Sequence, residues 1–202
     1  TRSVGVTGVQ TCALPIYLVF KYRGLLWGIF GFAVLFFPVQ FSVFRLLSAL
    51  PLLLMGQLLR FWAAGLIPRY RTLTVAAPIL VTSGPYAWIR NPLYAANGLM
   101  GCAWALMVGW WWVLAFLVVF SVMYLLIIIP HEECFLLAHF EDEYLRYKNT
   151  TPCIVPNSFC SRKRSMAGEC GFDLRKSWLM ERHSLAMNVV VSVLVFVRLY
   201  FA

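Results

Sequence analysis

The sequence predicts an all-α protein, a multi-pass transmembrane helical bundle of about five spans with a cofactor site on its cytoplasmic face. The 202-residue chain is 61% hydrophobic, has a mean hydropathy of +0.77 and is only 12% charged. A soluble domain carries roughly twice that charged fraction. Long apolar runs alternate with short polar connections, and most of the cations fall in alternate connections. The net charge of +9 is therefore explained by membrane orientation, and no nucleic-acid partner is expected.

The N-terminal residues are expected to lie outside the fold. Residues 6–16 resemble the translation of a sequencing-library adapter, and they lack the basic start and long apolar core of a signal peptide. We therefore expect residues 1–16 to be an artefact and residues 17–156 to form the membrane domain. Residues 157–202 are expected to form a basic cytoplasmic tail followed by a final transmembrane helix.

Two of the predicted spans lie in the first third of the chain. Leu25–Phe41 follows the cations Lys21 and Arg23, and its length suits a membrane helix, which needs about 20 residues. Phe44–Ile67 is the second span and carries Arg60 near its end. The sequence leaves two possibilities for Arg60, because such a side chain either snorkels to the interface or enters a polar site.

The remaining spans follow a polar connection over residues 68–92. Leu93–Pro130 contains no Asp, Glu, Lys, Arg or His, and its length predicts two antiparallel helices that turn near Gly109. His131–Lys148 is amphipathic and predicts a helix along the membrane face. Ser184–Phe201 is the last apolar run, long enough for a tilted span.

The cations predict the orientation of these spans. If Lys21 and Arg23 are cytoplasmic, residues 68–92 and 131–182 are cytoplasmic too, and only Arg45 and Arg198 fall on the far side. This asymmetry matches the positive-inside rule. We therefore expect a multi-pass integral membrane protein, with a prokaryotic inner membrane as its location.

Two polar segments meet on the cytoplasmic face in this topology. In the first, Asn91 is placed to cap the helix that Pro92 begins, and a capped helix entry with a snorkelling Arg90 would explain the pattern without any ligand. In the second, Glu132 and Glu133 point about 100° apart on a helix. We expect one carboxylate to contact a cationic ligand and the other to pair with a base or meet water, although a solvated helix start would also explain them.

Together, these segments resemble the methyltransferase family that includes isoprenylcysteine carboxyl methyltransferase and the phospholipid N-methyltransferases. The first signature reads LVTSGPY over residues 80–86 and RNPLY over residues 90–94. The second comprises a set of acidic and aromatic positions that ends in Pro156: Glu132, Glu133, Leu136, Phe140, Glu143, Tyr144 and Tyr147. The resemblance covers roughly Tyr17–Pro156.

The resemblance implies S-adenosyl-L-methionine as the methyl donor, held without a Rossmann domain. It implies catalytic roles for Arg90, Tyr94 and Glu132, and a hydrogen bond from the methionine ammonium to Glu132. It also implies a cofactor pocket lined by residues of both segments: Pro78, Ile79, Leu80, Val81, Tyr86, Asn91, Pro92, Leu93, Tyr94, Glu132 and Glu133.

The sequence departs from the family pattern at several positions. Asn91 stands where the family usually has histidine, and Ala96 and Glu141 stand where it usually has glycine. The eukaryotic isoprenylcysteine enzymes carry a carboxylate-binding arginine where this chain has Ile128. A prenylcysteine substrate is therefore less expected than the methyltransferase activity itself.

The predicted function is methyl transfer from S-adenosylmethionine to a lipophilic or lipid-linked acceptor, with a carboxylate as the first acceptor class. A phospholipid amine and a thiol are the alternatives, and an amine would need to lose a proton, for which His131 or a tyrosine is available. An NADPH-dependent protein similar to the sterol reductases is a more distant alternative, because those proteins usually lack the paired glutamates. The six cysteines form no CxxC pair, so no metal is expected.

Overall fold

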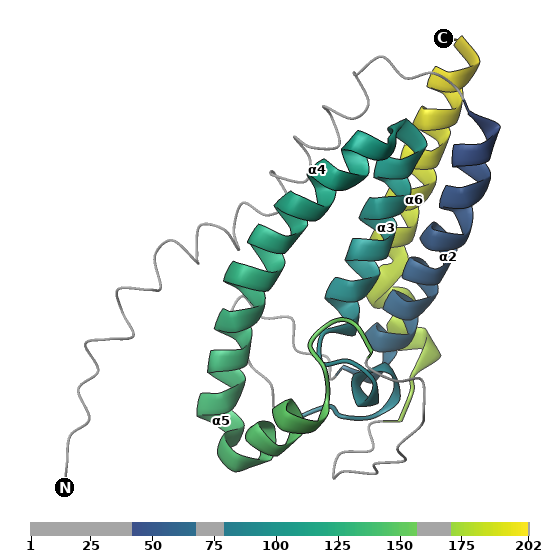
Figure 1. Ribbon diagram of the computed structural model, residues 1–202. Coiled ribbons are helices and arrows are strands. Elements are labelled where there is room, and N and C mark those ends of the chain that lie inside the picture. The colour runs from purple at the N-terminus through teal and green to yellow at the C-terminus, as the bar shows by residue number, and fades with distance from the viewer. Residues whose placement is uncertain (1–41, 68–78, 157–170, 202) are drawn as a thin grey trace, which may run out of the picture.

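The computed structural model describes residues 42–67, 79–156 and 171–201 (Figure 1). The predicted span Leu25–Phe41, the adapter-like residues and Pro78 lie outside these ranges. All regular structure in the described ranges is helical, which confirms the all-α class for this part of the chain. The elements in chain order are α2 Val43–Leu66, the 3-10 turn η2 Gly84–Ala87, α3 Pro92–Val108, α4 Trp110–Phe120, the π-helix η3 Ser121–Ile128, α5 Ile129–Thr150 and α6 Leu174–Phe201.

The predicted hairpin turn at Gly109 is confirmed, since α3 ends at Val108 and α4 begins at Trp110. Two glycines of α3 allow α4 to approach closely. A Cβ on Gly101 would lie 2.0 Å from the ring of Phe116, and a Cβ on Gly98 would lie 3.2 Å from the ring of Phe120. The aromatic rings of α4 therefore pack directly on the backbone of α3.

An arginine closes the same end of the bundle. Arg45 Nη1 donates a hydrogen bond of 2.7 Å to the carbonyl of Val108, in the last turn of α3. The last carbonyls of a helix have no partner within the helix, and they carry the negative end of its dipole. Arg45 thus supplies a hydrogen-bond donor and a positive charge to the C-terminus of α3.

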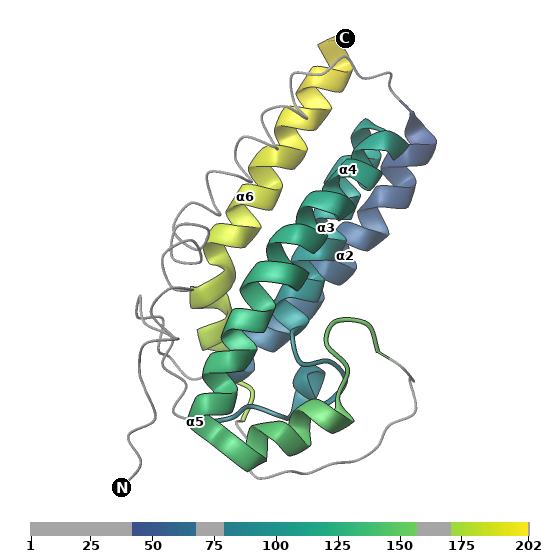
Figure 2. The same ribbon diagram turned by 60° about the vertical axis from the view of Figure 1, so that its left-hand side comes forward.

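From Trp110 to Thr150 the chain is helical over 41 residues apart from one kink, and we refer to this segment as the rod. The rod leans away from α3 below α4 and turns back beneath the bundle in α5 (Figures 1 and 2). The turn occurs at Glu141, whose φ of 45° and ψ of −120° interrupt the helical backbone. Glu141 is the only non-glycine residue with positive φ in the described ranges, and this conformation favours glycine.

Two helices of the described ranges are long and apolar enough to cross a membrane: α2 and the Trp110–Thr150 rod. α3 is apolar and 17 residues long. α6 begins at Leu174, well before the predicted apolar run at Ser184, so part of the predicted polar connection is helical. Asp173 caps the first turn of α6, because its carboxylate accepts from the backbone N–H of Lys176 at 3.1 Å.

Candidate functional site

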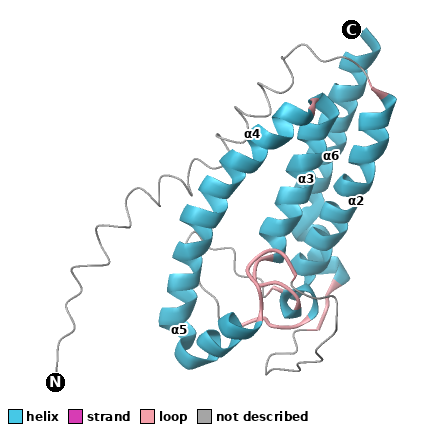
Figure 3. Ribbon diagram, viewed as in Figure 1, coloured by secondary structure: helices cyan, strands magenta, loops and turns pink. Residues whose placement is uncertain are grey.

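The two polar segments meet at one end of the bundle, where the loops over residues 79–91 and 151–156 lie beside the kinked end of α5 (Figure 3). The first loop connects to the start of α3, and the second follows the end of α5. Residues that are far apart in sequence therefore come together at this end, as the topology predicts.

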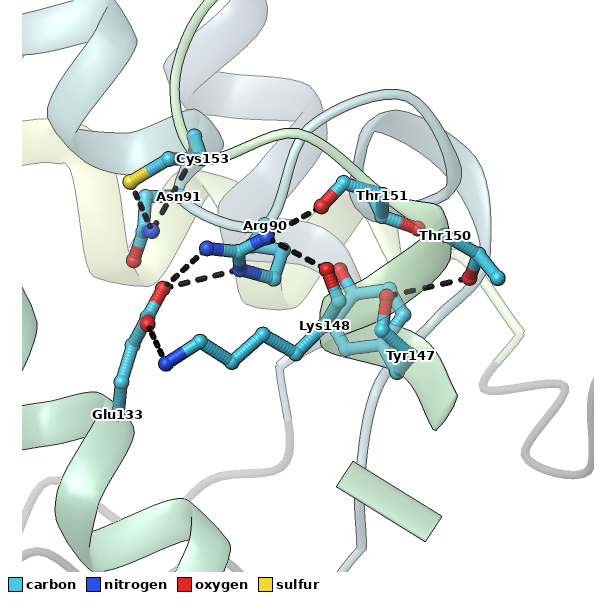
Figure 4. A network of polar contacts seen from close by, with 8 residues as sticks. All are labelled: Arg90, Asn91, Glu133, Tyr147, Lys148, Thr150, Thr151 and Cys153. Carbon is cyan, nitrogen blue, oxygen red and sulfur yellow. Dashed lines mark hydrogen bonds and ion pairs between the residues drawn. The ribbon is translucent and has the colours of Figure 1, made fainter. Parts of the chain in front are cut away.

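Arg90 holds these segments together (Figure 4). Its Nε donates to Glu133 Oε1 at 2.9 Å, and its Nη2 lies 2.8 Å from the same oxygen. Its Nη1 donates to the carbonyls of Lys148, at 3.0 Å, and of Thr151. The Nζ of Lys148 pairs with the other oxygen of Glu133 at 3.0 Å. We refer to these four residues as the Arg90 clamp.

The clamp is ionic and largely enclosed. The side chains of Arg90 and Glu133 are 11% and 9% exposed. Burial opposes the charge on Arg90, but the hydrogen bond and charge of Glu133 outweigh it, so the pKa of Arg90 is raised above its usual value. Arg90 is a cation at every physiological pH, and its donors point at protein acceptors.

Backbone hydrogen bonds extend the junction. The backbone N–H of Arg90 donates to Pro152 at 2.9 Å, and that of Asn91 donates to Cys153 at 3.1 Å. The Nδ2 of Asn91 also donates to the carbonyl of Cys153, at 3.3 Å. Asn91 does occupy the N-cap position before Pro92, but its side chain makes no capping hydrogen bond. The expected side-chain cap is therefore not formed, and the Asn91 side chain instead connects α3 to the 151–156 loop through its Nδ2.

The adjacent glutamates face different partners, as the helical geometry predicts. Glu133 belongs to the Arg90 clamp, whereas Glu132 Oε1 accepts a 2.6 Å hydrogen bond from the hydroxyl of Tyr94. The ring of Tyr94 packs on that of Tyr124, with centroids 4.8 Å apart. Tyr124 is itself buried in the cluster of α4 and η3. The first motif thus supplies a hydroxyl that is oriented on the carboxylate of the second.

Tyr86 lies close to the same carboxylate. Its carbonyl accepts a 2.6 Å hydrogen bond from the hydroxyl of Tyr147, which fixes the η2 turn against α5. Burial raises the pKa of the Tyr86 phenol above its usual value, and the nearby Tyr147 and Glu132 raise it further. The phenol therefore stays protonated, so it can donate a hydrogen bond.

The other predicted pocket residues lie in different surroundings. Leu80 is buried with Tyr144 and Tyr147, in a small cluster that Leu136 and Phe140 complete. Ile79 is 47% exposed. Pro92 is buried, whereas Val81 and Leu93 are partly buried. The structure brings the predicted residues from Ile79 onward to one end of the bundle, with Leu80 committed to packing.

Sequence reasoning missed the contribution of the chain after Tyr147. Lys148 supplies an ammonium and a carbonyl to the junction, and Thr151 and Cys153 each supply a carbonyl. Backbone carbonyls leave no mark in residue type, so no motif could have revealed them. The charge of Lys148 gave a weak signal, because it follows Glu133 by several helical turns and only the kink at Glu141 brings the two together.

The arrangement suits a cationic or hydrogen-bonding ligand at Glu132. This carboxylate is oriented by Tyr94, and the neighbouring charge of Glu133 is balanced by Arg90 and Lys148. A carboxylate beside an ammonium group favours the charged form of both. In the part of the chain that the structure describes, no group of three or more His, Cys, Asp or Glu residues could hold a metal ion.

Comparison with known proteins gives one match. The family model described as phospholipid methyltransferase matches residues 44–143. The matched segment begins in α2 and extends just past the kink at Glu141, so it contains the Tyr94–Glu132 pair and both side chains of the Arg90–Glu133 pair. No curated protein and no solved structure matches the chain.

Proposed function

Because residues 44–143 belong to the phospholipid methyltransferase family of membrane methyltransferases, we propose that this chain is an S-adenosylmethionine-dependent methyltransferase that acts on a lipophilic acceptor at the membrane. The observation that carries the proposal is the junction of the two motifs. The Arg90–Glu133 pair joins them, and the Tyr94 hydroxyl orients Glu132 beside this pair at 2.6 Å.

In the proposed donor site, Glu132 accepts a hydrogen bond from the methionine ammonium of S-adenosylmethionine. Tyr94 holds the carboxylate in position, and the protonated phenol of Tyr86 supplies a further donor. The lining comes from the segments on either side: Pro78, Ile79, Leu80, Val81, Asn91, Pro92 and Leu93. Glu133 and Arg90 act as positioning residues in this proposal, because their charged groups are engaged with each other.

When bound, the donor supplies a methyl group on a sulfonium that is already activated toward in-line displacement. The protein therefore mainly orients the acceptor and keeps water out. The acceptor atom forms the new bond to the methyl carbon while the carbon–sulfur bond breaks. The electron pair of the broken bond remains on sulfur. An amine must first lose a proton, for which the neighbouring His131 and the Tyr94–Glu132 pair are the candidate groups.

Among acceptors, a phospholipid amine is better supported than a carboxylate. The two cations that the structure places at the junction, Arg90 and Lys148, are both paired with Glu133. Ile128, which stands where the resemblance expects a carboxylate-binding arginine, is fully buried. A carboxylate acceptor would thus need a cation that these residues do not offer, so it becomes the second candidate.

The proposed location is a multi-pass membrane protein with this site on the cytoplasmic face. Arg90 and Lys148 lie at the site end of the helices, and Arg45 lies at the opposite end. α2 and the Trp110–Thr150 rod supply two membrane-crossing helices, and α3 connects them as a shorter apolar helix.

The test is donor binding and methyl transfer by the detergent-purified full chain. We expect S-adenosylmethionine and S-adenosylhomocysteine to bind, and Glu132→Gln to weaken binding at least tenfold, because one charge-assisted hydrogen bond is lost. Asp142→Asn, an exposed acidic change beyond the kink, is the matched control and should bind normally.

Methyl transfer to phosphatidylethanolamine in vesicles, compared with transfer to a prenylcysteine carboxylate and to a lipophilic thiol, separates the acceptor classes. Folded wild-type protein that binds neither donor nor product would sink the proposal. Binding of NADPH by the same protein would then favour the reductase alternative.

A further inference from the structure

α6 packs against α2 through polar contacts inside the bundle. The Nε of Arg60 lies 2.5 Å from Glu181 Oε2, and Gln57 Oε1 accepts from Asn188 Nδ2 at 2.6 Å. Residue numbers fall along α2 as they rise along α6, so the two helices are antiparallel. The two helices also approach closely at Gly65, where an added Cβ would lie 2.2 Å from Ser177 Oγ.

The remaining surface of α6 is mostly apolar, and the exposed polar residues that the structure describes on it, Arg175, Arg182 and His183, lie in its first half. The inward-facing side of α6 carries fully buried Ser177 and Glu181. Large apolar side chains are exposed on the outside: Trp178, Leu179, Met187, Val189, Val190, Val193, Leu194 and Val197. A helix that is polar toward its neighbours and apolar toward its surroundings is typical of a membrane span, where polar side chains connect helices. This arrangement supports the predicted fifth span.

The Arg60 pair also reaches α3. The Nη1 of Arg60 donates to Asn97 Oδ1, and Asn97 follows Tyr94 by three residues, which is about one helical turn. A single guanidinium therefore connects α6, α2 and the turn of α3 that presents Tyr94 to Glu132. Arg60 thus enters a polar site, which answers the choice that the sequence leaves open.

Stability alone does not explain this cluster. Glu181 is fully buried, and its Oε1 has no hydrogen-bond partner in the described part of the chain. Removing a carboxylate from water is unfavourable, and a well-packed apolar pair often serves stability as well as a buried ion pair does. What an ion pair adds is a defined relative position of the helices that carry it.

We propose that Arg60, Asn97 and Glu181 are positioning residues for the Tyr94–Glu132 site. Glu181 fixes the guanidinium of Arg60 against α6, and Arg60 holds Asn97 and hence the first turns of α3. The helix α6, which lies outside the matched family segment, is thereby part of what shapes the donor site. The expected loss of activity rests on the proposed function, whereas the expected loosening of the first turns of α3 does not require a bound donor.

Asn97→Leu is the decisive variant, because it removes the connection to α3 and leaves the Arg60–Glu181 pair in place. In nanodiscs without donor, we expect hydrogen exchange of the peptide spanning residues 88–98 to rise at least threefold, while α6 stays protected. We also expect kcat to fall at least fivefold with a smaller change in the KM for S-adenosylmethionine. Ser192→Ala, which alters a hydroxyl bonded within α6 itself, is the matched control and should leave both readouts unchanged.

Unchanged exchange and kcat in Asn97→Leu would overturn the proposal and leave the cluster a purely structural contact. The conservative variant Asn97→Gln should restore part of the wild-type kcat, because it retains the amide acceptor. If the wild-type protein binds no donor but Asn97→Leu still loosens residues 88–98, the proposed function fails and the positioning role stands. If the wild type transfers methyl groups and the variant matches it, only the positioning role fails.

Discussion

The Arg90 clamp and the Arg60–Glu181 pair contain the same chemical groups in different surroundings. In the clamp, Arg90 and Lys148 engage both oxygens of Glu133, and Lys148 is 42% exposed to solvent. Inside the bundle, Glu181 is fully buried and one of its oxygens has no partner in the described ranges. Every charged group of the clamp has a partner, whereas the inner pair joins an arginine that is 18% exposed to a fully buried carboxylate that is only partly satisfied in the described ranges.

This difference indicates what each cluster contributes. A satisfied network joins loop segments and stabilises them, since every charged group gains a partner. An incompletely satisfied buried pair adds little net stability but is very sensitive to the loss of one partner. Substitutions in each cluster test this difference.

The largest effect is expected inside the bundle. Glu181→Ala leaves the partly buried guanidinium of Arg60 without its carboxylate and should lower the free energy of unfolding by about 3 kcal/mol. The double variant Arg60→Met/Glu181→Leu should recover most of this loss, because it removes both charges and keeps the volume. Denaturant unfolding in detergent measures both, and a double variant as unstable as the single one would show that the pair itself is stabilising.

A smaller loss is expected in the clamp. Glu133→Ala removes a carboxylate that accepts from Arg90 and Lys148, and should cost about 2 kcal/mol, because water can reach Lys148 and replace part of the interaction. Its apparent melting temperature should be compared with that of Glu143→Ala, an exposed position on the same helix. Equal melting temperatures for the two variants would mean that the clamp does not stabilise the junction.

The kink at Glu141 is expected to respond in the opposite direction. Its φ of 45° is strained for glutamate and natural for glycine, so Glu141→Gly should raise the free energy of unfolding by about 1 kcal/mol. Asp142→Gly, at a helical position, should instead lower it by about 1 kcal/mol. The same unfolding assay tests both, and a destabilised Glu141→Gly protein would contradict the strained geometry.

The smallest effect concerns Cys153, which accepts from Asn91 beside the clamp. Burial raises the pKa of this thiol, and the charge of Glu133 raises it further. A raised pKa lowers the thiolate fraction at neutral pH, so maleimide should modify Cys153 more slowly than exposed Cys134, with the rate rising as the pH approaches the raised value. Mass spectrometry of the labelled peptides measures the ratio, and faster labelling of Cys153 at pH 7 would contradict the prediction.

The sequence allowed the hairpin and the division between the two glutamates to be predicted. The uncharged run from Leu93 to Pro130 is too long for one span, so it had to turn, and Gly109 was the available break. The helical angle between Glu132 and Glu133 follows from backbone geometry alone. These features depend on local periodicity, which a single sequence contains.

Other features depend on contacts that residue type does not encode. The backbone reversal at Glu141 brings Lys148 to Glu133, and glutamate as a residue type gives no turn signal. The side chain of Asn91 forms no capping hydrogen bond, and its Nδ2 donates to the carbonyl of Cys153 in a loop far away in sequence. Arg60 could be assigned to a polar site only once Glu181, from a segment far away in sequence, was placed opposite it.

The hydrogen bond from Arg45 to the end of α3 affects how the chain could be inserted into a bilayer. In the proposed orientation this arginine is carried across the membrane, against the positive-inside rule. On the far side it meets a helix terminus of opposite partial charge, so the translocated cation is compensated within the protein. Arg45, one of the two cations that oppose the topology, is thus compensated by the end of α3, so that insertion of α3 and retention of this arginine on the far side are coupled.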